Sequence, residues 1–297
     1  MPKPRSRGVN PLFIHLGSGA GFFSGMGIVA LAIGLAFALP NRWMLAGCDI
    51  AVAVGMLLVA LSSTPLPPYV LPVWFVVTLV AIVALHVRST SMRTRAMFAG
   101  PALASCVIAS AIELPHHITP DPPAGPFTRL YVFGDSITAG IGREDGPRWP
   151  AIVQRVTGVT VVDLAISGAR VDDMTRVAGR TKLGDGLVLI EIGGNDMFRR
   201  TDVGSYEQEL DELLTRVTGP GRAVAMFELP LMPFHAEMAR VQRRVSAKHG
   251  IMLIPKRYFA SVFAGADATV DGLHLSGRGH QRMAQIVERV VGKSLKP

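Results

Sequence analysis

The chain has little of what disulfide-rich, metal-binding or nucleic-acid-binding proteins need. Its 297 residues include only two cysteines, Cys48 and Cys106, and both fall within long apolar runs. We expect small packing residues rather than a disulfide. The sequence lacks clustered His and Asp ligands, so neither a metal nor a cofactor is expected. Lys/Arg runs with interleaved aromatic residues are also absent, which argues against a nucleic-acid partner.

Charge is sparse as well, and it is evenly divided. Residues 1–127 hold seven Lys/Arg and three Asp/Glu. Residues 128–297 hold the other 23 Lys/Arg and 19 Asp/Glu, so each part carries a net charge of +4. A mildly basic surface that lies near anionic lipid is the simpler interpretation of this charge.

The first third of the chain is rich in long hydrophobic runs. Four apolar stretches occupy about residues 22–39, 43–62, 70–87 and 97–112. A helix needs about 20 largely apolar residues to cross a bilayer, within a range of about 17–25, so the fourth stretch is marginal. Because the four stretches show almost no polar stripe, residues 1–112 are predicted to be a multi-pass membrane region rather than a soluble bundle.

The predicted spans contain few chemical groups. Gly17, Gly21 and Gly25 recur every four residues, a spacing that lets helices approach closely. Asp49 lies about two turns into the second span and is either a functional carboxylate or one that bonds to a neighbouring helix. Basic residues at the two ends of the spans nearly balance, with a slight preference for an extracytoplasmic C-terminal domain.

Beyond a proline-rich linker at residues 113–127, the pattern changes to short strands alternating with helices. Strands are expected at 130–133, 159–164, 187–192, 223–229 and 251–254. Helices are expected at 149–157, 171–177, 206–217, 236–248 and 281–291. Apolar strands separated by helices indicate a parallel sheet covered on both faces. Residues 128–297 are therefore predicted to form a three-layer α/β/α flavodoxin-like sandwich with a five-stranded parallel sheet.

Polar motifs follow the first three predicted strands. Gly134-Asp135-Ser136 comes after the first strand, Gly168 after the second, and Gly193-Gly194-Asn195-Asp196 after the third. The carboxyl ends of parallel strands gather ligand-binding groups at one edge of a sheet. Asp135 and Asp196 are expected to cap turns by accepting backbone N–H bonds.

A histidine and a carboxylate lie just before the last predicted helix, in Asp271-Gly272-Leu273-His274. A serine hydroxyl is a weak nucleophile that needs a nearby base, and His274 is the best candidate. Asp271 is placed to orient the imidazole and to stabilise its charged form. His280 is the competing base, but it has no carboxylate three residues before it. Ser136, His274 and Asp271 are thus the predicted catalytic residues.

These four blocks resemble those of the SGNH hydrolases, also called the GDSL family of esterases and lipases, over residues 129–291. Trp149-Pro150-Ala151 is similar to the bacterial thioesterase/lysophospholipase/arylesterase branch. The resemblance implies that the oxyanion is bound by the backbone N–H groups of Ser136 and Gly168 and by the side-chain amide of Asn195. Leu275 departs from the family pattern, which often has Pro at this position.

The predicted function is a membrane-anchored serine esterase or acyl hydrolase that cleaves esters or thioesters through an acyl-enzyme. Met197, Phe198 and Phe234 are expected to contact an acyl chain, and Arg199-Arg200 either meets a phosphate head group or is simply solvated. The expected partners are a small acyl-ester or lipid substrate and the bilayer, and the oligomeric state is left open. The alternatives are an O-acyltransferase or deacetylase acting on envelope carbohydrate, and a catalytically inactive membrane receptor or scaffold.

Overall fold

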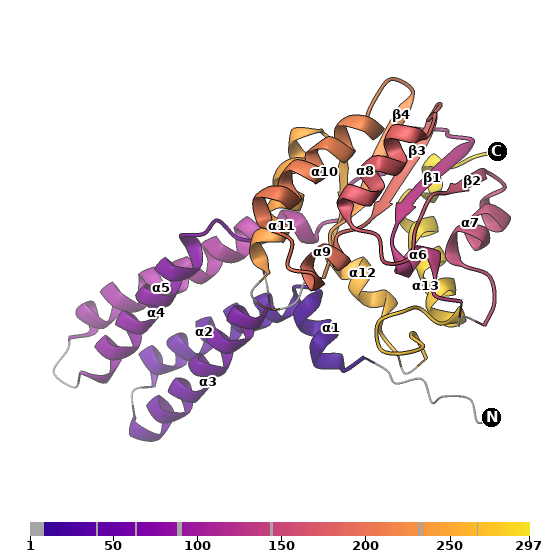
Figure 1. Ribbon diagram of the computed structural model, residues 1–297. Helices are drawn as coiled ribbons and strands as arrows, with labels where there is room; N and C mark the ends of the chain where they lie inside the picture. The colour runs from indigo at the N-terminus through magenta and orange to yellow at the C-terminus, as the bar shows by residue number, and fades with distance from the viewer. Residues whose placement is uncertain are drawn as a thin grey trace. The chain divides into compact units, whose positions relative to one another are not determined.

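The computed structural model describes residues 9–39, 41–62, 64–87, 91–142, 145–230, 233, 235–265 and 267–297. They divide into two compact units (Figure 1). His15–Ile118 make up most of a helical unit, and Thr119–Leu231 with Glu237–Pro297 make up most of a unit built on a β-sheet. In the described residues, one unit is thus built mainly of long helices and the other contains the sheet.

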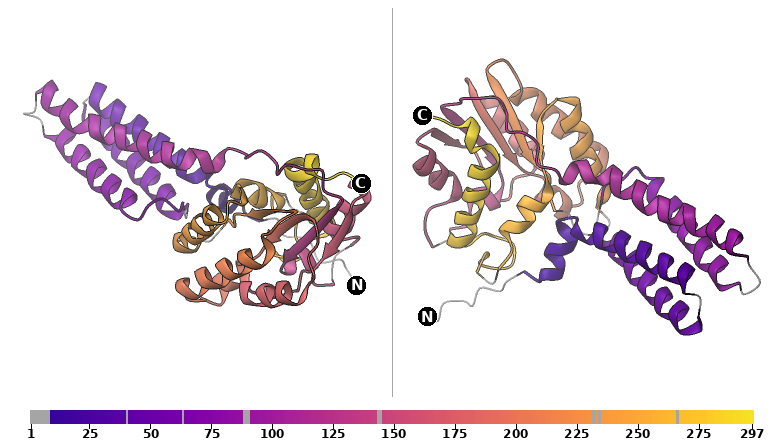
Figure 2. Two further views of the ribbon diagram at one scale, coloured as in Figure 1. Left: turned by 90° about the horizontal axis from the view of Figure 1, so that it is seen from above. Right: turned by 180° about the vertical axis from the view of Figure 1, so that it is seen from behind.

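Four long helices form the core of the helical unit, which begins within α1 (Pro11–Gly17). They are α2 (Ala20–Ala38), α3 (Arg42–Leu61), α4 (Val70–His86) and α5 (Met92–Glu113), which continues into a short 3-10 helix at Leu114–His117. Helix α2 packs against α3 and α5, and α5 packs against α4 (Figure 2). A single apolar cluster joins all four helices.

Three of these helices are long and apolar enough to cross a membrane: α2, α3 and the continuous run Met92–His117. Helix α4 has 17 residues and lies at the short end of the spanning range. The marginal stretch expected at 97–112 is instead part of the longest helix. Its start lies at Met92, because Ser91 caps the helix by accepting a bond of 3.2 Å from the Thr94 N–H.

Close packing of α2 on α3 depends on two glycines. A Cβ atom on Gly25 would lie 2.5 Å from the carbonyl oxygen of Gly55, and one on Gly55 would lie 2.7 Å from Cγ2 of Val29. Gly21, from the same four-residue repeat, lies against Leu16. A side chain at Gly34 would meet nothing within 4 Å. The small residues of α2 therefore differ in what they contact.

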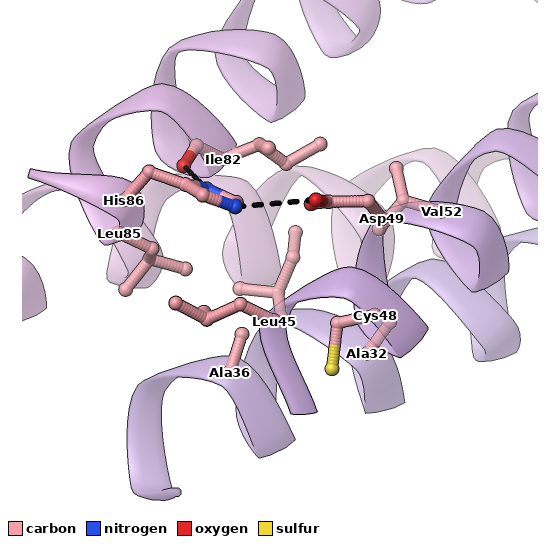
Figure 3. A pocket seen from close by; sticks show the side chains of 10 residues that line it. Ala32, Ala36, Leu45, Cys48, Asp49, Val52, Ile82, Leu85 and His86 are labelled. Carbon is pink, nitrogen blue, oxygen red and sulfur yellow. Dashed lines mark hydrogen bonds and ion pairs between the residues drawn. The ribbon is translucent and has the colours of Figure 1, made fainter. Parts of the chain in front are cut away.

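Asp49 of α3 pairs with a histidine of α4 (Figure 3). Its Oδ2 lies 3.1 Å from Nε2 of His86, and Nδ1 of His86 donates to the Ile82 carbonyl at 2.9 Å. The two side chains line a small, mostly apolar pocket together with residues of α2 such as Ala36. Of the two interpretations of Asp49, the structure shows the carboxylate bonded to a neighbouring helix.

The second unit contains a five-stranded parallel sheet with the strand order β2-β1-β3-β4-β5. The strands are β1 (Arg129–Gly134), β2 (Thr160–Asp163), β3 (Gly186–Glu191), β4 (Arg222–Phe227) and β5 (Met252–Ile254). This order is that of flavodoxin-like sheets, so the predicted fold class is confirmed. The central strand β3 is buried along its whole length, which explains why its sequence is almost continuously apolar.

Helices cover both faces of the sheet (Figure 1). One face is covered by α8 (Val171–Arg180), α10 (Val203–Val217) and α11 (Ala236–Lys248), and the other by α7 (Trp149–Thr157) and α13 (Gly277–Val291). Helix α13 begins four residues before its predicted start, because the Ser276 side chain caps it by accepting a bond from the Gly279 N–H. The short helices α6 (Ser136–Ala139), α9 (Gly194–Phe198) and α12 (Lys256–Val262) were not predicted.

The proline-rich segment is bonded to the sheet-containing unit along its length. Phe127 donates its N–H to the Ser294 carbonyl at 2.7 Å and accepts from the Lys296 N–H at 3.1 Å. Further back, Oγ1 of Thr119 lies 2.7 Å from the Tyr258 hydroxyl. These bonds hold residues 119–127 against the α/β unit, so this segment is not a free spacer.

Replacing Gly25 with Val should destabilise the helical unit, whereas Gly34→Val should not. At Gly25 the added side chain would overlap the Gly55 backbone, and overpacking of this kind typically costs about 1–3 kcal/mol. The measurement is the thermal unfolding midpoint of the detergent-solubilised full chain. Equal midpoints for the two variants would contradict the packing described here.

Candidate active site

Strand β1 delivers Ser136 into the first turn of a helix rather than onto an open turn. Asp135 caps this helix, α6, because its Oδ1 accepts the Ile137 N–H at 2.9 Å. A Cβ atom on Gly134 would lie 2.5 Å from Oγ1 of Thr138, so no side chain fits at the end of the strand. Ser136 itself is 7% exposed, and its place at the end of β1 is closely constrained.

The predicted base and its carboxylate lie on one short loop. A β-bridge between Thr269 and Leu275 closes this loop, and the Val270 N–H donates to the His274 carbonyl at 2.9 Å. Nδ1 of His274 lies 2.7 Å from Oδ2 of Asp271. When Nδ1 carries the proton that this bond uses, Nε2 is left as a base.

Hydrogen bonds keep the Asp271 carboxylate ionised. Partial burial would raise its pKa, but the bonds from the His274 side chain and from the N–H groups of His274 and Leu273 outweigh that effect and lower the pKa to about 2. The two backbone donors reach Oδ1 at 2.8 and 3.0 Å. A carboxylate held charged in this way can stabilise an imidazolium beside it.

No hydrogen bond joins the Ser136 hydroxyl to the His274 ring within the described residues. The charge of His274 nevertheless lies close enough to Asp135, the neighbour of Ser136, to lower the pKa of that carboxyl. Catalytic hydrogen bonds are often long or misaligned before substrate binds. The assignment of Ser136, His274 and Asp271 as a catalytic triad stays a prediction.

Asn195 links the loops that follow β1, β2 and β3. Its side-chain nitrogen donates to Oδ2 of Asp135 at 3.2 Å and to the Ala169 carbonyl at 2.9 Å. Gly168, next to Ala169, has a φ of 77°, a left-handed conformation that favours glycine. These bonds bring the three predicted oxyanion donors to one end of the sheet.

The backbone N–H groups of Ser136 and Gly168 donate to no acceptor among the residues that the structure describes. Ser136 is buried, and nearly all buried backbone N–H groups in proteins have a partner, so its open N–H is available to a ligand. Two open N–H groups at the strand ends can receive a negatively charged oxygen.

The two aspartates expected to cap turns do accept backbone N–H bonds. Oδ2 of Asp196 accepts the Val171 N–H at 3.1 Å and so holds the start of α8. Asp135 caps α6 and also accepts from Asn195, so its role is wider than expected. The pattern of a carboxylate after each strand was visible in the sequence, but the bond between Asp135 and Asn195 was not.

A buried polar network behind Ser136 was missed by sequence reasoning. Glu191, at the end of β3, is 1% exposed, and its Oε2 accepts from Oγ1 of Thr138 at 3.0 Å. Nε1 of Trp149 donates to Oγ1 of Thr138 at 3.3 Å, and the Trp149 N–H donates to Nδ1 of His280 at 3.4 Å. The sequence feature that could have indicated this role for Glu191 is a single carboxylate within an otherwise apolar strand. His280 is fully buried and belongs to this network through its bond with Trp149.

Burial also sets the protonation of the two carboxyls nearest Ser136. Burial raises the pKa of Asp135 to about 6, even though the Ile137 N–H and the His274 charge lower it. Burial and the neighbouring Asp135 charge raise the pKa of Glu191 well above its ordinary value. Two buried carboxyls this close favour a state in which one of them keeps its proton.

The residues expected to contact an acyl chain lie in different environments. Met197 is 7% exposed and belongs to the core, whereas Phe198 is 53% exposed on the surface of α9. Phe234 lies outside the described residues. Of the three, Phe198 is the residue that the structure places in contact with solvent near Asn195.

Replacing Glu191 with Gln should remove part of the pH dependence of stability. A carboxyl whose pKa rises on folding stabilises the folded state fully below its unfolded-state pKa of about 4.3, and this contribution is lost as the pH rises through the folded-state value. The wild-type unfolding midpoint should therefore fall relative to that of Glu191→Gln as the pH rises above about 4.3. The control is Glu288→Gln on the exposed side of α13, and parallel curves for all three proteins would refute the raised pKa.

Comparison with known proteins finds relatives of the part of the chain that holds this site. A model of the GDSL-like lipase/acylhydrolase family matches residues 132–282. Esterase TesA of Pseudomonas aeruginosa is 26% identical over 172 residues, which are 53% of this chain and 85% of TesA.

Solved structures of two esterases also match part of this chain. A crystal structure of TesA matches 55% of this chain and 97% of its own at 24% identity, with a TM-score of 0.47. The psychrotrophic esterase EstA from Pseudoalteromonas sp. matches 56% of this chain and 97% of its own at 18% identity, with a TM-score of 0.48. Because the family model covers half of the sequence, with the Ser136 and His274 blocks inside it, the chain belongs to the GDSL-like lipase/acylhydrolase family of SGNH hydrolases and is a serine hydrolase that acts on ester bonds.

Proposed function

We propose that the chain is a membrane-anchored acyl hydrolase in which Ser136 is the nucleophile, His274 the general base and Asp271 its orienting carboxylate. The observation that carries the assignment is the bond of 2.7 Å between Nδ1 of His274 and an ionised Asp271, on a closed loop of the same domain. Ser136 is held at the end of β1.

The reaction follows from these groups. Oγ of Ser136 attacks the ester carbonyl while Nε2 of His274 takes the hydroxyl proton, and that proton then passes to the leaving alcohol or thiol. Water, activated by the same histidine, attacks the acyl-enzyme and releases the carboxylic acid. The open N–H groups of Ser136 and Gly168 would bind the oxyanion in both steps. The side-chain amide of Asn195 would join them on releasing its bond to Asp135 or to Ala169.

Membrane anchoring is supported by α2, α3 and the run Met92–His117, which have the length and composition of spanning helices. We further propose that the catalytic domain lies on the extracytoplasmic side. Arg42, Arg93 and Arg95 lie at the starts of α3 and α5, and the positive-inside rule would keep those helix ends in the cytoplasm. Four spans would then place the chain after α5 outside.

Ser136→Ala should abolish hydrolysis of short p-nitrophenyl esters by the detergent-solubilised full chain. Asn195→Ala should lower kcat by about 10²–10³-fold, because one oxyanion donor is lost. The control is Ser205→Ala, on the exposed side of α10. Undiminished turnover by Ser136→Ala would refute the assignment of the nucleophile.

A C-terminal fusion decides the side of the membrane. Alkaline phosphatase is active only outside the cytoplasm, and a green fluorescent protein exported through the general secretory route does not fluoresce. We expect phosphatase activity without fluorescence for fusions made at Pro297. Bright fluorescence with an inactive phosphatase would reverse the proposed orientation.

A further inference from the structure

A buried hydroxyl two residues after Ser136 joins the helix of the predicted nucleophile to two other parts of the α/β unit. Thr138 lies in α6, and it is fully buried. Its Oγ1 donates to Oε2 of Glu191 at 3.0 Å and accepts from Nε1 of Trp149 at 3.3 Å. Because an indole N–H can only donate, the hydroxyl proton is left for Glu191. None of these three side chains takes part in the proposed reaction steps.

Glu191 contacts the chain on both sides of Ser136. In the sheet it lies opposite Gly134, in the register of β1 and β3. Burial and the nearby Asp135 charge raise the pKa of Glu191, whereas bonds from the Thr138 hydroxyl and the Asp135 N–H oppose that rise. One buried carboxyl therefore holds the residue before the nucleophile as well as the helix that follows it.

Trp149 extends the same network to the helix that follows the His274 loop. Its backbone N–H donates to Nδ1 of His280 at 3.4 Å, and both residues are fully buried. His280 belongs to the first turn of α13, and its own N–H donates to the Ser276 carbonyl at 2.9 Å. Helix α13 packs against α7, the helix that Trp149 begins (Figure 1).

The His274 loop ends where α13 begins. The Ser276 N–H donates to the Ala268 carbonyl at 3.0 Å, and Leu275, which is 1% exposed, lies in the β-bridge that closes the loop. A Cβ atom on Gly279 would lie 2.2 Å from the Ala268 carbonyl oxygen, so the first turn of α13 lies directly against the start of the loop. The backbone of His274 is therefore attached to the helical turn that the buried network holds.

These bonds form a path between the two parts of the predicted site. Ser136 and His274 share no direct hydrogen bond among the described residues, so their spacing is set by the protein around them. A misplacement of about 1 Å in a reacting group can cost about 10²-fold in rate. The path runs from Glu191 to His280, and Thr138 is the point at which it enters the helix of the nucleophile.

We propose that Thr138 is a positioning residue whose hydroxyl fixes the distance from Oγ of Ser136 to Nε2 of His274. It does so through its bonds to Glu191 and Trp149. This inference rests on the proposed esterase function of Ser136. Because Thr138 is fully buried, it acts through these side chains and not by touching the substrate.

The shape of Thr138 and its hydroxyl can be separated by substitution. The space around the side chain is tight, since a Cβ atom on Gly134 would lie 2.8 Å from Cβ of Thr138. Thr138→Val keeps the branched shape but removes the donor to Glu191 and the acceptor of Trp149. Thr138→Ser keeps the hydroxyl and loses only the methyl group.

The test measures kcat and KM for a short p-nitrophenyl ester with the full chain in a neutral detergent. The endpoint of exhaustive fluorophosphonate labelling counts the active sites, so kcat refers to folded enzyme alone. We expect Thr138→Val to lower kcat by about 10–10²-fold with KM within about twofold, because nucleophile and base are misaligned while the substrate contacts remain. Thr138→Ser should keep kcat within about threefold, because its hydroxyl still donates and accepts.

Thr175→Val is the matched control. Thr175 is a 7% exposed threonine of the same unit, and its hydroxyl donates to the carbonyls of Val171 and Glu209 at 3.0 and 3.2 Å. Its replacement also removes a buried hydroxyl, so it should lower the unfolding midpoint without changing kcat per active site. An equal loss of kcat in Thr175→Val, or an equal loss in Thr138→Ser and Thr138→Val, would overturn the proposal.

Trp149→Phe decides the question if Thr138→Val does not fold. This variant retains an aromatic ring and the backbone N–H that bonds to His280, and it removes the Nε1 donor. We expect kcat per active site to fall about tenfold with KM unchanged, because one side of the path is broken. A kcat equal to that of the wild type would refute the positioning role.

The outcomes separate this inference from the function on which it rests. If the wild type neither cleaves the ester nor takes up the label, the proposed function fails. If the wild type is active and Thr138→Val has the same kcat per labelled site, the hydrolase stands and the positioning role of Thr138 is wrong.

Discussion

The site depends on one buried carboxylate, Asp135. Its two oxygens accept from the Ile137 N–H, which starts the helix of Ser136, and from the side-chain amide of Asn195. Asn195 in turn donates to the Ala169 carbonyl beside Gly168. Asp135 and Asn195 together therefore join the loops after β1, β2 and β3, and the open backbone N–H groups of Ser136 and Gly168 remain available at this end of the sheet.

The two units of the chain meet different physical demands. The helical unit packs through close backbone approach at Gly25 and Gly55 and exposes many large apolar side chains, as expected where lipid rather than water is the solvent. The α/β unit buries its apolar strands and places its exposed hydrophobic residues mainly around the predicted site.

Much of the fold and of the site could be predicted from the sequence, because the spacing of apolar residues along the chain indicates which residues are buried. The five strands, the long helices and the Ser136, Asn195 and His274 blocks follow from apolar runs and from the residues that end them. The short helices α6 and α9 could not be predicted, since four or five residues carry no period. The bonds of Glu191 and Trp149 to Thr138 depend on pairings between distant strands and helices, which a linear pattern does not contain.

The proposed mechanism requires Ser136 to be the activated nucleophile, and covalent labelling tests this requirement most directly. The full chain is incubated with a fluorophosphonate, and the site of the adduct is located by peptide mass spectrometry. We expect one adduct on Ser136, lost in His274→Ala because the hydroxyl is no longer activated. A folded wild-type protein that takes up no label, or takes it up at another residue, would contradict the mechanism.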